Sequence, residues 1–349
     1  MSGFKIRPYE AGDEEQILNL FNRVFSADNP DFTPRDMDAW RHTYERNPCG
    51  HKTLVGTDLD GNIVANYSSC PVKIHVKGEE RVASQVVDSC VDIAWRRSLR
   101  KNSLFITIAH EYQRTYCDIS QPTFNDFIYG LPNENHYPLG VRLLGYTPVH
   151  CPLPRQVRDF DEGWSSELAA RAGDVVAKEA DWTQLEVVAE LAARHAGDMS
   201  LGNVRDLPYL AWRYRDWPEQ PYGLIIARRG GGTEGGGEGE PCGAVFFRVG
   251  VPWEKRPVVA VLDWFGSGSD EQTMAALLSK VAAVAWEREH ARLETWLTPA
   301  MPHIDCLREL GLAQENTQFN LCMVLFSQDY DISWVQKNWH LTMGDTDIY

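Results

Sequence analysis

Four basic residues gather within six positions of the chain, immediately before a segment with helical spacing. They are Arg96, Arg97, Arg100 and Lys101, and Asn102–Ser103 follows with side chains that can cap a helix. The first turn of a helix presents unpaired amide groups and partial positive charge, which suit a phosphate. The pattern predicts an anion site; a solvated basic loop paired with surface acids is the alternative.

The apolar pattern places this basic loop between a strand and a helix. Ala83–Ile93 is rich in β-branched residues and is expected to form a buried central strand. Apolar residues then recur with helical spacing from Leu104 to Tyr112. Further elements are expected around this unit: strand Phe4–Pro8, a helix after Gly12-Asp13, hairpin strands Thr53–Gly56 and Ile63–Ser68, strand Asp126–Gly130, and a short helix ending near Tyr146.

The second half of the sequence repeats this order of elements. It contains a helix through Leu185, strands Tyr222–Ala227, Gly243–Val249 and Val258–Phe265, a helix from Glu271, and a closing strand Leu321–Phe326. We therefore expect a mixed α/β (α+β) protein built from two copies of one plan. The expected division is an N-terminal domain over residues 1–150, a connector over 151–173 and a C-terminal domain over 174–349.

Composition agrees with two folded domains and excludes several partners. The chain has 349 residues, of which 43% are hydrophobic and 24% charged, as in globular proteins. Its 34 basic against 49 acidic residues give a formal charge of −15, which disfavours nucleic acid and anionic membranes. The 8 cysteines form no C-x-x-C pair, and no metal site is expected. Without an apolar leader or membrane span, a cytoplasmic location is expected.

Four motifs carry a resemblance to a known family. They are Ile6-Arg7-Pro8 with Gly12-Asp13, the strand meander, Cys90–Arg96, and Tyr129–Asn135 followed by Leu144-Gly145-Tyr146. With them the chain resembles the GNAT acyltransferase superfamily, in particular a subgroup with tandem domains. The resemblance implies tandem GNAT-like domains with central mixed sheets, of which the second is degenerate. It also implies acyl transfer from acyl-coenzyme A, such as acetyl-CoA, to a primary amine of a small molecule or peptide.

The resemblance also implies which residues hold the coenzyme. These are the end of the central strand, the basic loop with the following helix start, and a later turn: Cys90, Val91, Arg96, Arg97, Arg100, Lys101, Asn102, Ser103 and Asn133. The loop departs from the family, which places glycine or alanine where this chain has Arg100 and Asn102, or Leu99 and Lys101 in the other register. Either the basic side chains replace the close backbone approach that glycine allows, or coenzyme binding is weak or lost.

Three residues are candidates for proton transfer. Asp88, on the buried strand, is the first candidate for the base that accepts the amine proton; a buried acceptor that ties down a loop is the alternative. His136 is the second, against a plain surface histidine. Many GNAT enzymes protonate the departing thiolate with a tyrosine, and Val141 stands at that position in this chain. Tyr137, one turn earlier, is the third candidate; a tyrosine that packs the helix is the alternative.

Two other functions stay open at this stage. The missing glycines and tyrosine also suit a non-catalytic GNAT-fold protein that binds a ligand or a partner. Aminoacyl transfer from charged tRNA on a paired GNAT scaffold is disfavoured by the charge of −15.

Overall fold

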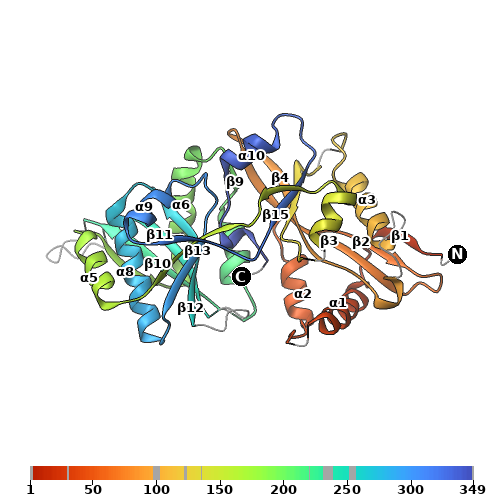
Figure 1. Cartoon of the computed structure of the whole chain (residues 1–349), viewed down its shortest axis with the longest axis horizontal. Coiled ribbons are helices and arrows are strands. Elements are labelled where there is room, and N and C mark those ends of the chain that lie inside the picture. Colours follow the sequence, from red (N-terminus) through yellow and green to blue (C-terminus); the bar gives the residue numbers. More distant parts are fainter. Residues whose placement is uncertain are drawn as a thin grey trace. The chain divides into compact units, whose positions relative to one another are not determined.

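The computed structural model describes residues 3–29, 31–96, 103–121, 124–134, 136–219, 221–230, 239–250 and 257–347. The chain forms two compact units (Figure 1). Unit 1 contains residues 1–74, 80–151 and 319–332, and unit 2 contains 75–79, 152–318 and 333–349. Each unit is built on one mixed sheet flanked by helices, which confirms the expected fold class.

Unit 1 has a sheet with the strand order β1-β2-β3-β4-β5-β15-β6. The strands are β1 (Lys5–Pro8), β2 (Lys52–Thr57), β3 (Ile63–Val76), β4 (Glu79–Val91), β5 (Phe127–Gly130), β15 (Leu321–Leu325) and β6 (Thr147–His150). The helices are α1 (Glu14–Asp28), α2 (Met37–Tyr44), α3 (Leu104–Tyr116) and α4 (His136–Leu139), with a 3-10 turn η1 (Ile93–Trp95) after β4 and a π-turn η2 (Gly140–Leu144) after α4.

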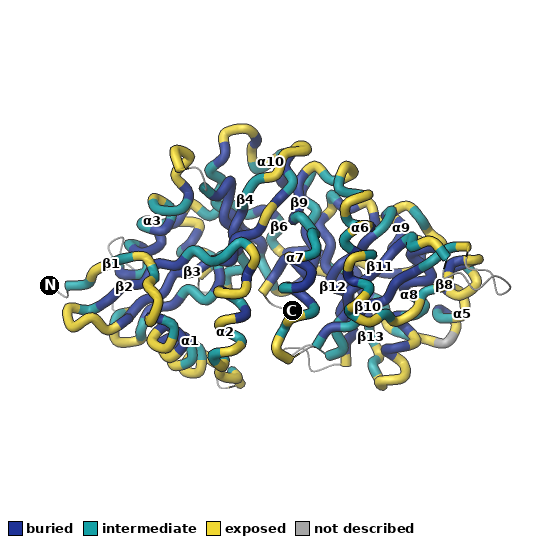
Figure 2. Tube along the Cα trace, turned by 180° about the vertical axis from the view of Figure 1, so that it is seen from behind, coloured by how far each residue is buried: buried dark blue, intermediate teal, exposed yellow. Residues whose placement is uncertain are grey.

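Alternation along the strands of unit 1 separates two apolar cores. Neighbouring residues of a strand point to opposite faces, so Leu54 and Val55 of β2 belong to different cores. Leu54 packs with α3, and Val55 packs with α1 and α2. Figure 2 shows the resulting band of buried strands, with exposed residues concentrated in turns and outer helix faces.

Unit 2 has a sheet with the order β14-β7-β13-β12-β11-β10-β8. The strands are β14 (Ala313–Asn316), β7 (Pro154–Asp159), β13 (Arg292–Trp296), β12 (Val258–Gly266), β11 (Glu240–Val249), β10 (Tyr222–Arg229) and β8 (Val176–Ala180), and the short strands β9 (Leu201–Asn203) and β16 (Trp339–His340) pair with each other. The helices are α5 (Glu162–Arg171), α6 (Leu185–His195), α7 (Leu207–Leu210), α8 (Glu271–Glu287), α9 (His303–Glu309) and α10 (Ile332–Asn338), with a π-turn η5 (Ala211–Arg215) after α7.

The two sheets have the same plan, but each contains a strand from the other half of the sequence. In sheet 1, β15 lies between β5 and β6; in sheet 2, β7 occupies the corresponding place between β13 and β14. β7 follows β6 along the chain, and β15 follows β14, so each copy gives its last strand to the other sheet. The duplication read from the sequence is present, with a reciprocal exchange of strands.

This exchange corrects two expectations. Leu321–Phe326 was expected to close the second copy, but β15 pairs with β5 and β6 of unit 1. Residues 151–173 were expected to be a connector, yet they contain β7 and α5, and Trp164 of α5 is buried in the core of unit 2. Prolines favour a connector in this segment, but Pro154 is the first residue of β7, a position where the missing amide donor is tolerated. No helix in the described ranges is long and apolar enough to cross a membrane.

Candidate functional site

The parallel strands β4 and β5 separate soon after they meet. Their pairing covers only Ser84 with Ile128 and Gln85 with Tyr129, although β4 continues to Val91. In unit 2, the parallel pairing of β12 with β13 similarly ends at Ala260 with Glu294, while β12 continues to Gly266. Strands that diverge in this way free main-chain groups to bind something other than a neighbouring strand.

Asp88 lies on the separated part of β4 and is held by two partners. Its carboxylate accepts hydrogen bonds from both terminal nitrogens of Arg35, which precedes α2, and from the hydroxyl of Tyr44 at 2.6 Å. Its backbone has a left-handed φ of 53°, which is uncommon outside glycine and interrupts the regular pleat of β4. The amide of Asn66 donates to the Asp88 carbonyl at 3.1 Å. Asp88 therefore fastens the segment before α2 and α2 itself to the central strand.

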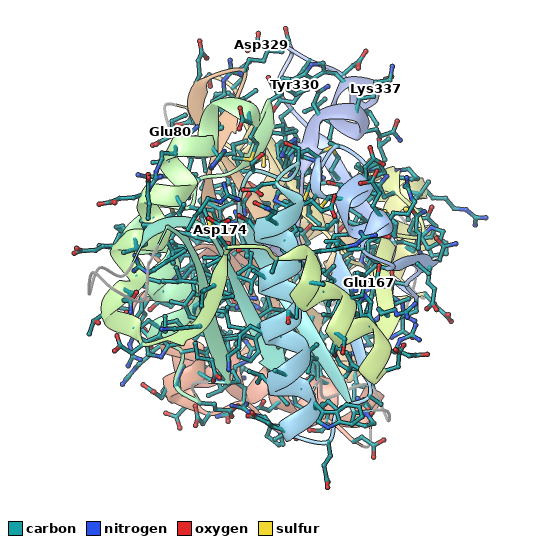
Figure 3. The ribbon with its side chains drawn as sticks, turned by 90° about the vertical axis from the view of Figure 1, so that its left-hand side faces the viewer. Glu80, Glu167, Asp174, Asp329, Tyr330 and Lys337 are labelled. Carbon is teal, nitrogen blue, oxygen red and sulfur yellow. The ribbon has the colours of Figure 1, made fainter. Side chains whose placement is uncertain are left out.

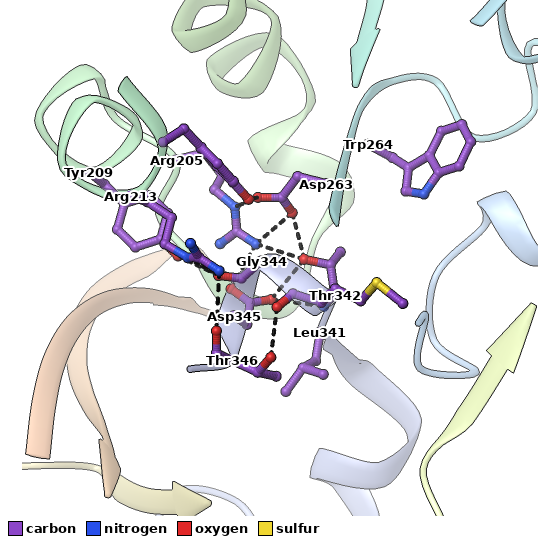
Figure 4. Close-up of polar contacts among 12 residues, drawn as sticks. Arg205, Tyr209, Arg213, Asp263, Trp264, Leu341, Thr342, Gly344, Asp345 and Thr346 are labelled. Atoms are coloured by element: carbon purple, nitrogen blue, oxygen red, sulfur yellow. Dashed lines mark hydrogen bonds and ion pairs between the residues drawn. The ribbon is translucent and has the colours of Figure 1, made fainter. Parts of the chain in front are cut away.

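Unit 2 contains the same clamp at the corresponding place. Asp263 of β12 accepts two hydrogen bonds from Arg205, at 3.0 and 3.1 Å (Figure 4). It accepts a third from the Tyr214 hydroxyl at 2.6 Å. Arg205 also pairs with Asp345 near the C-terminus. In both units, an Arg-Asp dipeptide precedes a helix and a tyrosine follows the arginine by nine positions. This repeated spacing of arginine, aspartate and tyrosine is visible in the sequence, although the sequence analysis above did not identify it.

The end of β4 leads into the predicted coenzyme loop. Cys90 and Val91 are buried, and burial, together with the Asp88 charge, raises the pKa of the Cys90 thiol. Arg96 forms a bidentate ion pair with Asp28 at 2.9 Å and donates to the Val91 carbonyl at 3.0 Å. The other predicted loop residues lie outside the described residues: Arg97, Arg100, Lys101 and Asn102.

The helix start and the later turn meet through an aromatic contact. Ser103 caps α3 as expected, accepting a hydrogen bond from the Ile106 amide. The His136 ring stacks on Phe105, in the first turn of α3, at 5.4 Å between centroids. Asn133 caps the chain leading into α4, since its side-chain oxygen accepts from the His136 amide at 2.9 Å. Desolvation and the Arg96 charge lower the pKa of His136, so the ring is neutral at neutral pH.

Tyr137, the second residue of the short helix α4, lies beside the Cys151 thiol. Burial and the neighbouring Cys151 thiol raise the pKa of Tyr137, so its hydroxyl is protonated at neutral pH. The Cys151 sulfur lies 3.9 Å from that of Cys322 on β15, and this contact lowers the pKa of Cys151.

The structure thus gathers some of the predicted residues and leaves others apart. His136 stacks on Phe105 in the first turn of α3, the helix that Ser103 caps, and the charge of Arg96 acts on His136. Asp88 is instead engaged by Arg35 and Tyr44, on the side of the sheet that packs with α2. Among the described residues, no group of three or more His, Cys, Asp or Glu side chains could hold a metal ion.

Comparison of the sequence with protein families identifies one domain. Residues 5–116 match the family described as the acetyltransferase (GNAT) domain. This segment includes β1 to α3, and therefore Asp88, Arg96 and Ser103. No curated protein matches the sequence significantly.

Solved structures resemble the chain over almost its whole length. A probable N-acyltransferase from Enterococcus faecalis is 11% identical with a TM-score of 0.62, covering 93% of this chain and 73% of that one. A GCN5-related N-acetyltransferase from Kribbella flavida is 14% identical with a TM-score of 0.60, covering 93% and 71%. The Saccharomyces cerevisiae N-myristoyltransferase with bound myristoyl-CoA is 12% identical with a TM-score of 0.55, covering 93% and 83%. The chain therefore has the GNAT fold in two tandem units, and its residues 5–116 match the acetyltransferase (GNAT) domain family.

Proposed function

We propose that unit 1 transfers an acyl group from acyl-coenzyme A, such as acetyl-CoA, to a primary amine of a small molecule or peptide. The observation that carries the proposal is the early separation from β5 of strand β4, which lies inside the segment that matches the GNAT domain. The opened edge of β4 leads through Arg96 to the capped start of α3. Main-chain groups of β4 would hold the extended arm of the coenzyme, and the amide groups and basic side chains at α3 its phosphates.

The proposed reaction joins nitrogen to the acyl carbon and releases the coenzyme thiol. The amine lone pair attacks the thioester carbonyl, the carbon–sulfur bond breaks, and the amine loses one proton while the thiolate gains one. A lysine-like amine has a pKa of about 10.4, so a neutral nucleophile requires an acceptor for that proton. A thiol pKa of about 8.5 makes the thiolate a fair leaving group.

We assign the proton acceptor to His136 and the proton donor to Tyr137. His136 is neutral at neutral pH and lies against the first turn of α3, close to the proposed coenzyme arm. Tyr137 keeps its proton, as a donor to the thiolate must. Asp88 is assigned to positioning, because its carboxylate already accepts three hydrogen bonds from Arg35 and Tyr44.

Charge reversal in the basic loop tests coenzyme binding. Arg97→Glu with Arg100→Glu should remove the thermal stabilisation by coenzyme A, which is about 2.7 kcal/mol at a ligand concentration of 100 times Kd. Arg46→Glu with Arg114→Glu is the matched control, because it changes net charge equally at exposed residues of unit 1 outside the loop. Unchanged coenzyme binding in the loop variant would contradict the proposed site.

Substitution of His136 tests the chemical step. His136→Gln should lower kcat by about 100-fold or more with an acetyl-CoA donor and a panel of amines, and should remove the acid limb of the pH profile. That limb should lie below the ordinary histidine pKa of about 6.5, because the pKa of His136 is lowered. His110→Gln, on α3, is the control and should leave the pH profile unchanged.

A non-catalytic GNAT-fold binding protein is the second candidate. The observation that favours it is the absence of glycine at the family's loop positions, where Arg100 and Asn102 stand. Stabilisation by coenzyme A without turnover of any amine in the panel would select this second function.

A further inference from the structure

Unit 2 contains a cavity of about 530 Å³ near the end of its central strand. Its walls come from α6 and the residues that follow it, the end of β9 and the segment after it, the end of β12, the start of α9 and the segment around β16, together with His75 of β3. Every residue that lines it belongs to unit 2. A cavity of this size is in the range of small-molecule sites.

Buried polar side chains without partners line this cavity. His303 is 6% exposed, and neither of its ring nitrogens has a hydrogen-bond partner among the described residues. Asn203 is 2% exposed, and within the same ranges both polar atoms of its amide also lack a partner. A buried polar group without a hydrogen-bond partner lowers the stability of the folded protein. A bound ligand can supply the missing hydrogen bonds, so such groups in a cavity indicate a binding site.

Arg205 adds a third unsatisfied donor. Its Nε and one Nη bond Asp263, and the same Nη approaches Asp345 at 2.7 Å (Figure 4). The other terminal nitrogen, Nη1, is buried beside the cavity without a partner in the described part of the chain. The lining of the cavity therefore offers a donor from Arg205, and both donor and acceptor capacity from Asn203 and His303.

The charged and apolar side chains that line the cavity indicate which class of ligand it can bind. The lining contains one guanidinium, that of Arg205, and four carboxylates, those of Glu190, Asp198, Asp206 and Asp263. Asp263 is paired with Arg205, Asp198 lies 3.1 Å from His195, and Asp206 accepts a hydrogen bond from the Tyr209 amide. Burial lowers the pKa of His303 to about 4 and also lowers the pKa of His340, so these two rings add no charge at neutral pH. This excess of negative charge repels anions and attracts a cation. The remaining walls are mainly apolar and include Trp264, Leu207 and Met301.

We propose that this cavity binds a small organic amine that has an apolar body and a hydroxyl group. The hydroxyl group accepts from Arg205 Nη1 and bonds Asn203 and His303, the body packs against Trp264 and Met301, and the ammonium group lies toward Asp198 and Asp206. The lining of this cavity belongs to unit 2, so the proposed amine site is distinct from the acyl-transfer site proposed in unit 1.

Four related probes test the three parts of the ligand. Tyramine has the amine, the ring and the hydroxyl group; phenethylamine lacks the hydroxyl, tyrosol replaces the amine with an alcohol, and phloretic acid replaces it with a carboxylate. By calorimetry on the full chain, tyramine should bind at least tenfold more tightly than phenethylamine or tyrosol, and phloretic acid should not bind measurably. Absence of tyramine binding at millimolar concentration, or equal binding of phloretic acid, would overturn the proposal.

Substitutions locate the site and separate it from unit 1. Asn203→Leu and His303→Leu should each weaken tyramine binding at least tenfold while raising the melting temperature of the unliganded protein, because an unsatisfied polar group is replaced by an apolar one. Gln156→Leu is the matched control: both polar atoms of its buried amide also lack a partner in the described ranges, but it does not line the cavity. It should leave binding unchanged.

The same titrations distinguish this proposal from the one for unit 1. His136→Gln should leave tyramine binding unchanged, whereas a loss with that variant would place the amine in unit 1 and overturn the proposal. If the leucine variants at Asn203 and His303 both keep full tyramine affinity, the cavity is not the binding site.

Discussion

At the scale of single residues, the clearest feature is a clamp that occurs twice. Arg35 and Tyr44 hold Asp88 in unit 1, and Arg205 and Tyr214 hold Asp263 in unit 2. In each unit the clamp joins a helical segment to the central strand beside the point where parallel strands separate. A geometry kept in both copies is a property of the shared plan, which favours a positioning role for Asp88.

Removal of one hydroxyl measures the strength of the clamp. Tyr44→Phe should lower the free energy of unfolding by about 1.5 to 3 kcal/mol, the usual contribution of a hydrogen bond to a charged group. Tyr116→Phe is the control, because that hydroxyl donates to the uncharged Thr53 carbonyl at 3.3 Å and should cost about 0.5 to 1.5 kcal/mol. Denaturant unfolding of both variants makes the comparison; an equal or smaller loss for Tyr44→Phe would contradict the clamp.

Lys52, at the start of β2, predicts a pH dependence of stability. Its amine donates to Asn125 at 2.7 Å, and burial lowers the pKa of Lys52 to about 8. Between about pH 8 and the ordinary lysine pKa of about 10.4, the unfolded chain binds a proton that the folded chain does not. The contribution of Lys52 therefore makes the protein more stable as pH rises through this window.

Lys52→Met should remove that part of the rise. The measurement is the melting temperature of the wild type and the variant across the same pH window, with Lys5→Met, on β1, as the control. Parallel curves for wild type and Lys52→Met would show that Lys52 keeps its ordinary pKa in the folded chain.

At the scale of elements, the exchanged strand β15 can be tested by chemistry at its neighbour. Cys322 of β15 and Cys151, just after β6, have sulfur atoms 3.9 Å apart, and both are free thiols. Mild oxidation with diamide should therefore form a Cys151–Cys322 disulfide within one chain, which peptide mapping without reduction would detect. Cys151→Ser should abolish this crosslink. A disulfide joining Cys322 to any other cysteine would contradict the strand order β5-β15-β6.

Local sequence patterns predicted most of the helices and strands, but they did not predict which strands pair with one another. The buried strand at Ala83–Ile93, the Ser103 cap and the duplicated order of parts all carry their signal in neighbouring residues. Which sheet receives Leu321–Leu325 depends on edges more than 160 residues away, for example His150. A strand that pairs in either sheet has the same alternation of apolar residues, so this local pattern could not predict the exchange.

The candidate site was predictable to a similar extent. The family motif and the helix cap gave the region around Arg96 and Ser103. The partners of Asp88 and the cavity around His303 and Asn203 arise from packing between segments distant in sequence. Only the repeated Arg-Asp spacing could have indicated the clamp, and no local pattern marks the cavity.

At the scale of the whole chain, the net charge is strongly negative, and the basic loop of residues 96–101 differs from it in sign. The formal charge is −15, and exposed acidic side chains such as Glu80 in unit 1 and Glu167 and Asp174 in unit 2 project from their surfaces (Figure 3). An anionic coenzyme therefore depends on the local basic loop rather than on the overall field. Salt screens both the attraction of coenzyme A to the basic loop and its repulsion by the rest of the protein. A measured affinity for coenzyme A would therefore not identify the loop as the binding site, and the comparison of the charge-reversal variant with its control is needed.

The exchange of strands also decides whether half of the chain can fold alone. Residues 1–150 contain six of the seven strands in the order β1-β2-β3-β4-β5-β15-β6; the missing one is β15, which joins β5 to β6. Without β15, the burial of Leu321 and Met323 is lost, at about 1.5 to 3 kcal/mol for each side chain. Total stabilities are only about 5 to 15 kcal/mol, and the edges of β5 and β6 would also lose their partner.

We therefore expect residues 1–150, produced alone, to show no cooperative thermal transition by circular dichroism. Residues 1–151 joined through a flexible glycine-serine linker to 319–332 should restore the transition, because this chain contains all the segments of unit 1. The matched control carries Leu321→Asp and Met323→Asp in the added segment, which keeps its length but cannot bury these residues between β5 and β6. If residues 1–150 unfold cooperatively without the added strand, β15 is dispensable, and the sequence-based boundary at residue 150 describes an autonomous domain after all.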